Sequence, residues 1–306
     1  MIITRKLAFT KEFTMKQFLV VIGFYCSMLA SSIAQEQPWQ PVEKIFDRKG
    51  ATRGDVFKIT FPRSDLTVKI GAIRIDPGLA LTSWVAFLPM PDQSVMTMGD
   101  LVMLGTEVGP VTKKLVQEGI EVTALHNHLI NESPKDMYMH FSGQGDAVKL
   151  AESIKKALAE TKTPMGPAPS SPPVQKPDTD WSKVEVVLGY TGTHKGKLLQ
   201  VSVPRVESIT EMQMDIPPFM GTATGINFQR EGNKAATTGD FVLVADEVPK
   251  VVKELTIRGI QVTAIHNHML NETPRMFMVH FWGYDDPEKL ARGLRAALDK
   301  TNSVKK

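Results

Sequence analysis

The sequence predicts an α+β fold made of two tandem homologous domains, each a mostly antiparallel sheet with two helices packed on one face. Two observations predict it. A long segment of the chain occurs twice at a constant spacing, and in each copy strand-like segments precede and follow helical ones. With 306 residues, the chain also has the length of two domains rather than one.

The repeated segment covers Thr97 to Phe141 and Thr237 to Phe281, which align at an offset of 140 residues with about half of the positions identical. Solenoid repeats have periods of roughly 20 to 50 residues, so this longer period indicates tandem domains. We expect a first domain at residues 38–160 and a second at 181–301. Between them, residues 161–180 contain six prolines and predict a semi-rigid linker.

The elements of the first copy follow from local composition and spacing. Strands are expected where β-branched and aromatic residues lie between Pro, Gly and Asp residues, and a helix where apolar residues recur every three or four positions. These criteria predict strands at 56–61, 67–75, 84–88, 121–130 and 137–142, and a helix at 107–118. Gly119 suits the left-handed end of that helix, and residues 131–134 predict a turn between the last two strands.

A second helix is expected to close each domain. After Asp146, apolar residues follow the spacing of a helix that packs on a sheet. In the second copy, Asp286 is the expected N-cap and Pro287 the first helical residue. Together with the earlier helix, this places two helices on one face of each sheet.

Residues 1–34 have the pattern of a secretory signal peptide. Basic residues precede an apolar run at 18–30, and Ser32-Ile33-Ala34 is a small-x-small cleavage signal. The run is shorter than the roughly 20 apolar residues that span a bilayer. The mature chain is therefore expected to be periplasmic or secreted and to have no transmembrane span, with an uncleaved anchor as the alternative.

Removal of this segment changes the charge and the set of available ligands. The full chain has a net charge of +3, which residues 1–34 alone account for, so a near-neutral mature chain argues against a nucleic-acid partner. The single cysteine, Cys26, lies within the removed run. A metal site in the mature chain must then use His, Asp, Glu, Asn or Met.

Histidine placement is the main functional signal. Six of the seven histidines fall at matching positions of the two copies: His126, His128 and His140 in the first, and His266, His268 and His280 in the second. Residues i and i+2 of a strand point to the same face, and the third histidine of each copy lies on the next strand. In a hairpin centred near Pro134, we expect His140 opposite His128, so that three imidazoles converge in each domain. A slip of one residue would send His140 to the other face.

Three converging neutral imidazoles favour a divalent transition metal, with Zn²⁺ preferred and Cu²⁺, Ni²⁺ and Fe²⁺ as alternatives. Glu132 and Glu272 follow the second histidine of each copy by four residues and are candidates for a metal ligand, a catalytic general base or a turn residue. This His-x-His-x3-Glu spacing is similar to the first metal motif of cupins, although the second cupin motif does not follow. With a metal-activated water and Glu132 or Glu272 as the base, the chemistry would be of hydrolase or lyase type.

Other features have plainer interpretations. The Gly-Asp pairs at 99–100 and 239–240 predict turns, with the alternative that the aspartate orients a ligating histidine. Glu107 and Glu247 suit helix N-termini. Sixteen methionines suggest copper, but most do not recur between the copies, which favours core filling.

The motifs together resemble the LppY/LpqO family of exported bacterial proteins. The resemblance is carried by Thr-x-Gly-Asp, Val-Thr-Ala-x-His-Asn-His, Asn-Glu-[Ser/Thr]-Pro and the His-Phe pair, all present in both copies. It implies export and two tandem copies of a domain of unknown function, and it supplies no activity.

We therefore expect a periplasmic or secreted protein with a three-histidine metal site in each repeat. The alternative is a non-catalytic cell-envelope binding module with structural histidines, whose two domains bind bivalently. A third arrangement pairs the halves as an intramolecular pseudo-dimer with a site at their interface. The expected partner is an unidentified small molecule or cell-envelope component, and the residues leave open whether the protein is an enzyme.

Overall fold

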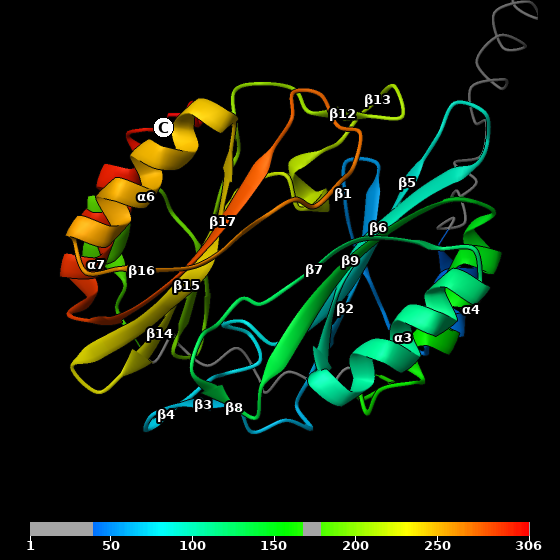
Figure 1. The fold of residues 1–306 in the computed structure, drawn as a ribbon, viewed down its shortest axis with the longest axis horizontal. Helices are drawn as coiled ribbons and strands as arrows, with labels where there is room; N and C mark the ends of the chain where they lie inside the picture. Colours follow the sequence, from blue (N-terminus) through cyan, green and yellow to red (C-terminus); the bar gives the residue numbers. More distant parts are fainter. Residues whose placement is uncertain (1–38, 168–178, 306) are drawn as a thin grey trace, which may run out of the picture. The chain divides into compact units, whose positions relative to one another are not determined.

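The computed structural model describes residues 39–167 and 179–305 (Figure 1). The predicted signal peptide at 1–34 and the centre of the predicted linker lie outside these residues. The described residues from Pro41 onward form one compact unit that contains both copies of the repeat. None of the helices in the described ranges is long and apolar enough to cross a membrane.

The first copy forms a six-stranded antiparallel sheet in the order β1-β2-β5-β6-β9-β7. Its strands are β1 (Ala51–Arg53), β2 (Val56–Pro62), β5 (Thr82–Pro89), β6 (Val95–Leu104), β7 (Glu121–His126) and β9 (Asp136–Gly145). A separate three-stranded sheet consists of β3 (Lys69–Ile70), β4 (Ile73–Arg74) and β8 (Glu132–Ser133). The helices are α2 (Gln40–Phe46), α3 (Gly105–Gln117) and α4 (Ala147–Leu158).

The second copy repeats this architecture, with the sheet order β10-β11-β14-β15-β17-β16. Its strands are β10 (Thr193–Lys195), β11 (Leu198–Val203), β14 (Thr224–Glu231), β15 (Lys234–Leu243), β16 (Gln261–His266) and β17 (Phe277–Asp285). Its helices are α5 (Ser182–Leu188), α6 (Val248–Ile257) and α7 (Pro287–Leu298), with short 3-10 turns η1 (Pro218–Met220) and η2 (Ala245–Glu247). A small hairpin joins β12 (Thr210–Glu211) and β13 (Met214–Asp215).

The predicted fold class is confirmed, since both copies consist of an antiparallel sheet and helices. The helix ends also follow the predicted chemistry. Asp146 and Asp286 cap α4 and α7 by accepting hydrogen bonds from the third residue of each helix, at 3.0 and 2.8 Å. Gly119, after α3, has the left-handed φ of 76° that a helix stop requires. The short helices α2 and α5, by contrast, were not predicted.

The central strand β6 was also missed, and the Gly-Asp pair at 99–100 lies inside it, so the turn predicted there is wrong. The equivalent pair at 239–240 lies inside β15, and the turn predicted there is wrong too. Nine of the ten β6 residues are buried, because helices cover one face of the sheet and the second copy covers the other. A strand buried on both faces shows no polar alternation to detect. Gly99 is needed because a Cβ there would lie 2.3 Å from the ring of Phe141.

A buried ion pair fixes the start of each long helix. Arg63 Nη1 donates to Glu107 Oε2 at 2.8 Å, and Glu107 also accepts from the Leu104 backbone at 2.8 Å. In the second copy, Arg205 Nη1 donates to Glu247 Oε2 at 2.7 Å. The glutamates therefore lie at helix starts as predicted, but each also neutralises a buried arginine.

The sheet faces that point away from the helices pack against each other. Met98 of β6 shares a buried cluster with Val242 and Met278 of the second copy. Tyr138 of β9 shares another with Trp282 of β17. Methionines in this position fill the core between the copies, as their lack of recurrence indicated.

Candidate metal centre

Strand register places the histidines of each copy. β7 pairs with β9 so that His126 lies opposite Tyr138 and Ala124 opposite His140, after an irregularity in β7 between residues 122 and 124. Because residues paired across strands share a face, His126 and His140 point to the same side, with ring centroids 5.0 Å apart. His128 lies two residues beyond the end of β7. The expectation that His140 sits opposite His128 is therefore wrong, although the shared face of His126 and His140 is confirmed.

Side chains of the Val-Thr-Ala-x-His-Asn-His motif connect the two copies. The threonine and asparagine of each motif donate to backbone carbonyls of the other motif, so every bond has a reciprocal partner. These bonds are Thr123 to His268 at 2.6 Å, Thr263 to His128 at 2.7 Å, and Asn127 to Thr263 and Asn267 to Thr123 at 3.0 Å each. Reciprocal contacts are the signature of a local twofold relation, here between two halves of one chain.

This pairing gathers all six repeated histidines into one cluster. Rings from different copies lie against each other. His126 stacks on His266 with 3.6 Å between ring centroids, His128 stacks on His280 at 3.9 Å, and the rings of His140 and His268 lie 3.9 Å apart in a tilted arrangement. Three groups of residues each have potential ligand atoms that all lie within 4.8 Å of one another. The groups are His126, His140 and His266; His126, His128 and His280; and Asp240, His266 and His268. None of these groups consists of the three histidines of one copy. The expected separate site in each repeat is thus replaced by a shared cluster.

Backbone carbonyls orient the third histidine of each copy. His140 Nδ1 lies 3.1 Å from the carbonyl oxygen of Gly99, and His280 Nδ1 lies 2.8 Å from that of Gly239. A carbonyl can only accept, so each Nδ1 carries the hydrogen and each Nε2 keeps a free lone pair. Both Nε2 atoms are buried and have no hydrogen-bond partner among the described residues. This arrangement is typical of a metal-binding histidine.

Burial favours the neutral form of three of these histidines. Burial, followed by the neighbouring histidines, lowers the pKa of His128 and His140 well below its ordinary value. The same causes lower the pKa of His266 to about 3. Neutral imidazole is the form that binds a metal, so these three histidines need no deprotonation at neutral pH.

Two aspartates complete the cluster. Asp100 lies opposite His140 in the sheet, and its Oδ2 is 3.5 Å from His128 Nε2. Its equivalent, Asp240, approaches His268 Nε2 at 3.1 Å. Burial raises the pKa of Asp100 to about 7. At Asp240 burial also acts to raise the pKa, but the charge of His280 and the hydrogen bond from His268 outweigh it and lower the pKa to about 2. The aspartates therefore contact histidines, which was the alternative to the turns predicted for these Gly-Asp pairs.

Glu132 and Glu272 lie elsewhere. The backbone of Glu132 pairs with β3, and its buried carboxylate forms an ion pair with Lys135 at 2.6 Å. Glu272 accepts a hydrogen bond from the Met276 backbone at 2.9 Å and contacts Arg275 at 3.3 Å. Neither glutamate belongs to a group of potential metal ligands found in the described residues.

Aromatic residues beside the cluster carried no recognisable signal in the sequence, because the other copy lacks them. Tyr138 stacks on His128 with 3.4 Å between ring centroids, and the second copy has Met278 in its place. Trp84 lies edge-on to His140, with ring centroids 6.5 Å apart. The two sides of the cluster are thus lined differently.

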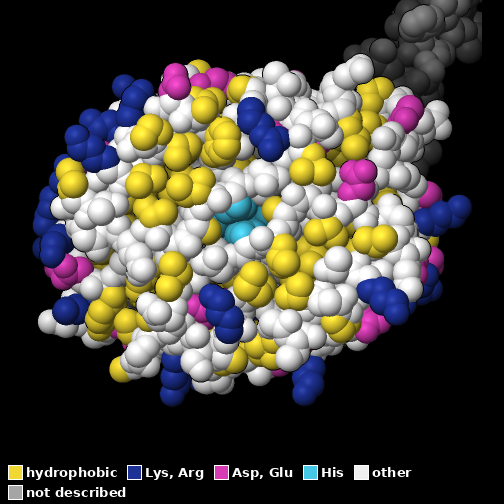
Figure 2. Space-filling view, in the orientation of Figure 1, with side chains coloured by type: hydrophobic (Ala, Val, Ile, Leu, Met, Phe, Trp, Pro, Cys, Tyr) yellow, Lys and Arg dark blue, Asp and Glu magenta, His cyan; other side chains and the backbone are white. Residues whose placement is uncertain are grey.

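The cluster is open at one face of the molecule. Figure 2 shows histidine side chains at the centre of this face, between hydrophobic side chains. His128 and His266 are half-buried, whereas the other four histidines of the cluster are buried. A small ligand can therefore reach the cluster from solvent.

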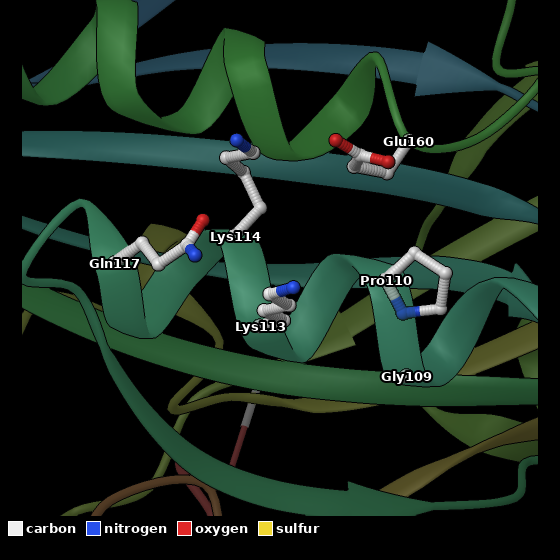
Figure 3. Close-up of a pocket in the computed structure, with 6 residues that line it drawn as sticks. All are labelled: Gly109, Pro110, Lys113, Lys114, Gln117 and Glu160. Atoms are coloured by element: carbon white, nitrogen blue, oxygen red, sulfur yellow. The ribbon is translucent and has the colours of Figure 1, made fainter.

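A polar recess of about 380 Å³ lies along the outer side of α3, near the end of α4 (Figure 3). Its lining contains no histidine and consists of Gly109, Pro110, Lys113, Lys114, Gln117 and Glu160. Since α3 covers the face of the sheet opposite the histidines, this recess is separate from the cluster.

Comparison with known proteins identifies the repeated unit. Residues 40–160 and 182–300 each match the family described as Domain of Unknown Function (DUF1259). No curated protein is similar enough to count as a relative. Two solved structures have low similarity to this chain. The trimeric bacterial microcompartment shell protein PduB is 10% identical, with 85% of this chain and 97% of that chain covered and a TM-score of 0.21. EtuB from Clostridium kluyveri is 9% identical, with 85% of this chain and 96% of that chain covered and a TM-score of 0.21. TM-scores this low carry no inference about this chain. With two matched segments that together make up most of its length, the chain belongs to the family described as Domain of Unknown Function (DUF1259).

Proposed function

We propose that this chain is an exported protein, periplasmic or secreted, that binds a divalent transition metal in the histidine cluster between its repeats. Zinc is the preferred ion, with copper, nickel and iron as alternatives. The observation that carries the proposal is the convergence of buried imidazole nitrogens that have a lone pair and no hydrogen-bond partner among the described residues, above all Nε2 of His140 and of His280.

The energetics favour a cation over purely structural histidines. A buried polar atom without a partner costs about 1–3 kcal/mol, and several such atoms lie together here. The cluster also contains the buried carboxyl group of Asp100 and the half-buried carboxylate of Asp240, whereas burial holds His128 and His140 neutral. A divalent cation would accept the free lone pairs and compensate the negative charge at once.

The ligands would come from the six repeated histidines, with Asp100 and Asp240 beside them. Bound there, the ion would supply Lewis-acid activation of water wherever a coordination position stays open. The role of Glu132 and Glu272 as general bases remains a prediction that depends on such chemistry. A small molecule or cell-envelope component would reach the cluster through the open face.

Export and membership of the LppY/LpqO family belong to the same proposal. They are supported by the pattern of residues 1–34 and by the motif set that both copies share. Mass determination of the protein recovered from a periplasmic or culture fraction tests export, and cleavage after Ala34 is the expected result. Recovery only as the full-length chain in the cytoplasm would contradict it.

Metal content tests the central part of the proposal. We expect the purified chain, after dialysis against Zn²⁺, to retain zinc in elemental analysis, and the double variant His140→Ala/His280→Ala to lose at least about 90% of it. The matched control is His194→Ala, because His194 contacts Glu185 outside the cluster. Circular dichroism shows whether each variant is folded. Zinc-free wild type, or equal zinc in the folded double variant, would refute the proposal.

A further inference from the structure

The local twofold relation divides the six histidines into two equivalent sets. Triad A contains His126, His128 and His280, and triad B contains His266, His268 and His140. Each triad takes two histidines from one copy and the third from the other copy. We propose that the cluster binds two metal ions, one in each triad, so that both ions connect the two repeats. This inference rests on the proposed function.

The internal geometry of the two triads agrees. In triad A, the ring centroids are 5.0 Å apart within the His-x-His pair, and 3.9 and 5.3 Å from the third histidine. The corresponding distances in triad B are 5.2, 3.9 and 5.7 Å. This equivalence is what two sites of one kind require. The ligand atoms of triad A converge within 4.8 Å, and those of His266 and His268 in triad B converge with Asp240 in the same way.

The spacing of the ligand atoms suits one ion in each triad. Two nitrogens bound tetrahedrally to zinc are about 3.3 Å apart, given Zn–N bonds of about 2.0–2.1 Å. In triad A, Nε2 of His126 and Nε2 of His128 are 3.1 Å apart. In triad B, His268 Nε2 lies 3.1 Å from Asp240 Oδ2, and these two residues belong with His266 to one group of potential ligands.

Each triad also has its own carboxylate. Asp100 approaches His128 of triad A at 3.5 Å. Asp240 approaches His268 of triad B at 3.1 Å, and its other oxygen lies 3.9 Å from His280 of triad A. Three histidines and one aspartate make a complete tetrahedral donor set. A single ion held by His126, His140 and His266 would leave the other histidines and both aspartates without a cation. Two ions satisfy all of these groups and act as a clamp between the repeats.

Two double variants separate this arrangement from sites confined to one repeat. His128→Ala/His280→Ala removes two ligands of triad A and leaves triad B intact. His128→Ala/His140→Ala removes one ligand from each triad, although both residues belong to the first copy. Calorimetric titration with Zn²⁺ alone, together with elemental analysis, gives the stoichiometry and affinity for each variant, and His194→Ala is the control.

We expect two equivalents of zinc for the wild type and for the control. His128→Ala/His280→Ala should keep one equivalent at wild-type affinity, and His128→Ala/His140→Ala should lose at least tenfold in affinity at both sites. If His128→Ala/His140→Ala instead keeps one equivalent and His128→Ala/His280→Ala weakens both sites, the shared triads are overturned in favour of one site in each repeat. One equivalent in the wild type would overturn the two-ion arrangement alone, whereas none would overturn the proposed function as well. Near-ultraviolet circular dichroism shows whether each variant is folded. The twofold equivalents are His268→Ala/His140→Ala for the first variant and His268→Ala/His280→Ala for the second, and each replaces its counterpart if that variant is not folded.

Discussion

The two copies of the repeat hold the last histidine of the His-x-His pair in different ways. His268 is fixed by a carbonyl, with its Nδ1 3.1 Å from the oxygen of Gly221. His128 instead stacks on the ring of Tyr138, with 3.4 Å between centroids. A carbonyl selects one tautomer and one ring direction, whereas stacking restrains only the plane of the ring. The second copy is therefore the better preorganised half of an otherwise symmetric centre.

The buried arginines test whether the copies are equally important for the fold. We expect Arg63→Ala and Arg205→Ala each to lower the free energy of unfolding by about 3–5 kcal/mol, because each leaves a buried glutamate without its counter-charge. Urea denaturation measures the loss, and exposed Lys149→Ala is the control. A loss of less than about 1 kcal/mol in either variant would show that the ion pair of that copy is dispensable.

Gly221→Ala tests the carbonyl contact to His268. Gly221 has a left-handed φ of 90°, and a Cβ there would lie 3.2 Å from the ring of Trp84, so we expect a loss of about 1–3 kcal/mol in stability and weaker zinc binding in triad B. Gly232→Ala is the matched control, because Gly232 also has a positive φ, of 61°, but no atom near its Cβ. If both variants bind zinc like the wild type, the contact does not preorganise His268.

The threonines of the motif test the reciprocity of the interface. Thr123→Val and Thr263→Val each remove one hydrogen bond between the copies, and each should cost about 1 kcal/mol in thermal or chemical unfolding. Thr256→Val, which removes an exposed local bond within α6, is the control. Clearly unequal costs for the two motif threonines would contradict a twofold interface.

Tyr138→Met places in the first copy the residue that the second copy has at the equivalent position, Met278. Of these substitutions, it should have the smallest effect on stability and zinc binding. Loss of the stack on His128 is worth about 0.5–1.5 kcal/mol, so the zinc affinity of triad A should fall by roughly tenfold or less. Competition with a chromophoric chelator measures this change. An unchanged affinity would mean that His128 needs no support from Tyr138.

The features predictable from the sequence are those with a local cause. The N-caps at Asp146 and Asp286 and the shared face of His126 and His140 follow from side-chain periodicity within one copy. β6 escaped detection because a strand buried on both faces has no alternating pattern, and its Gly-Asp pair is typical of turns.

The shared cluster could not be predicted from one copy, because periodicity within a domain does not say which surfaces of two domains meet. One signal was available in the motif itself. Thr123 and Asn127 are identical to Thr263 and Asn267, yet neither residue type is needed for a strand or preferred as a metal ligand. Their recurrence is explained by the reciprocal bonds they make across the interface.

The most direct test of the central claim is anomalous diffraction from crystals of the zinc-loaded protein, collected on both sides of the zinc absorption edge. We predict two zinc peaks between the repeats, each within about 2.0–2.2 Å of histidine nitrogens from both copies. Peaks bound by histidines of one copy alone, or zinc located only outside the cluster, would contradict a metal centre shared between the repeats.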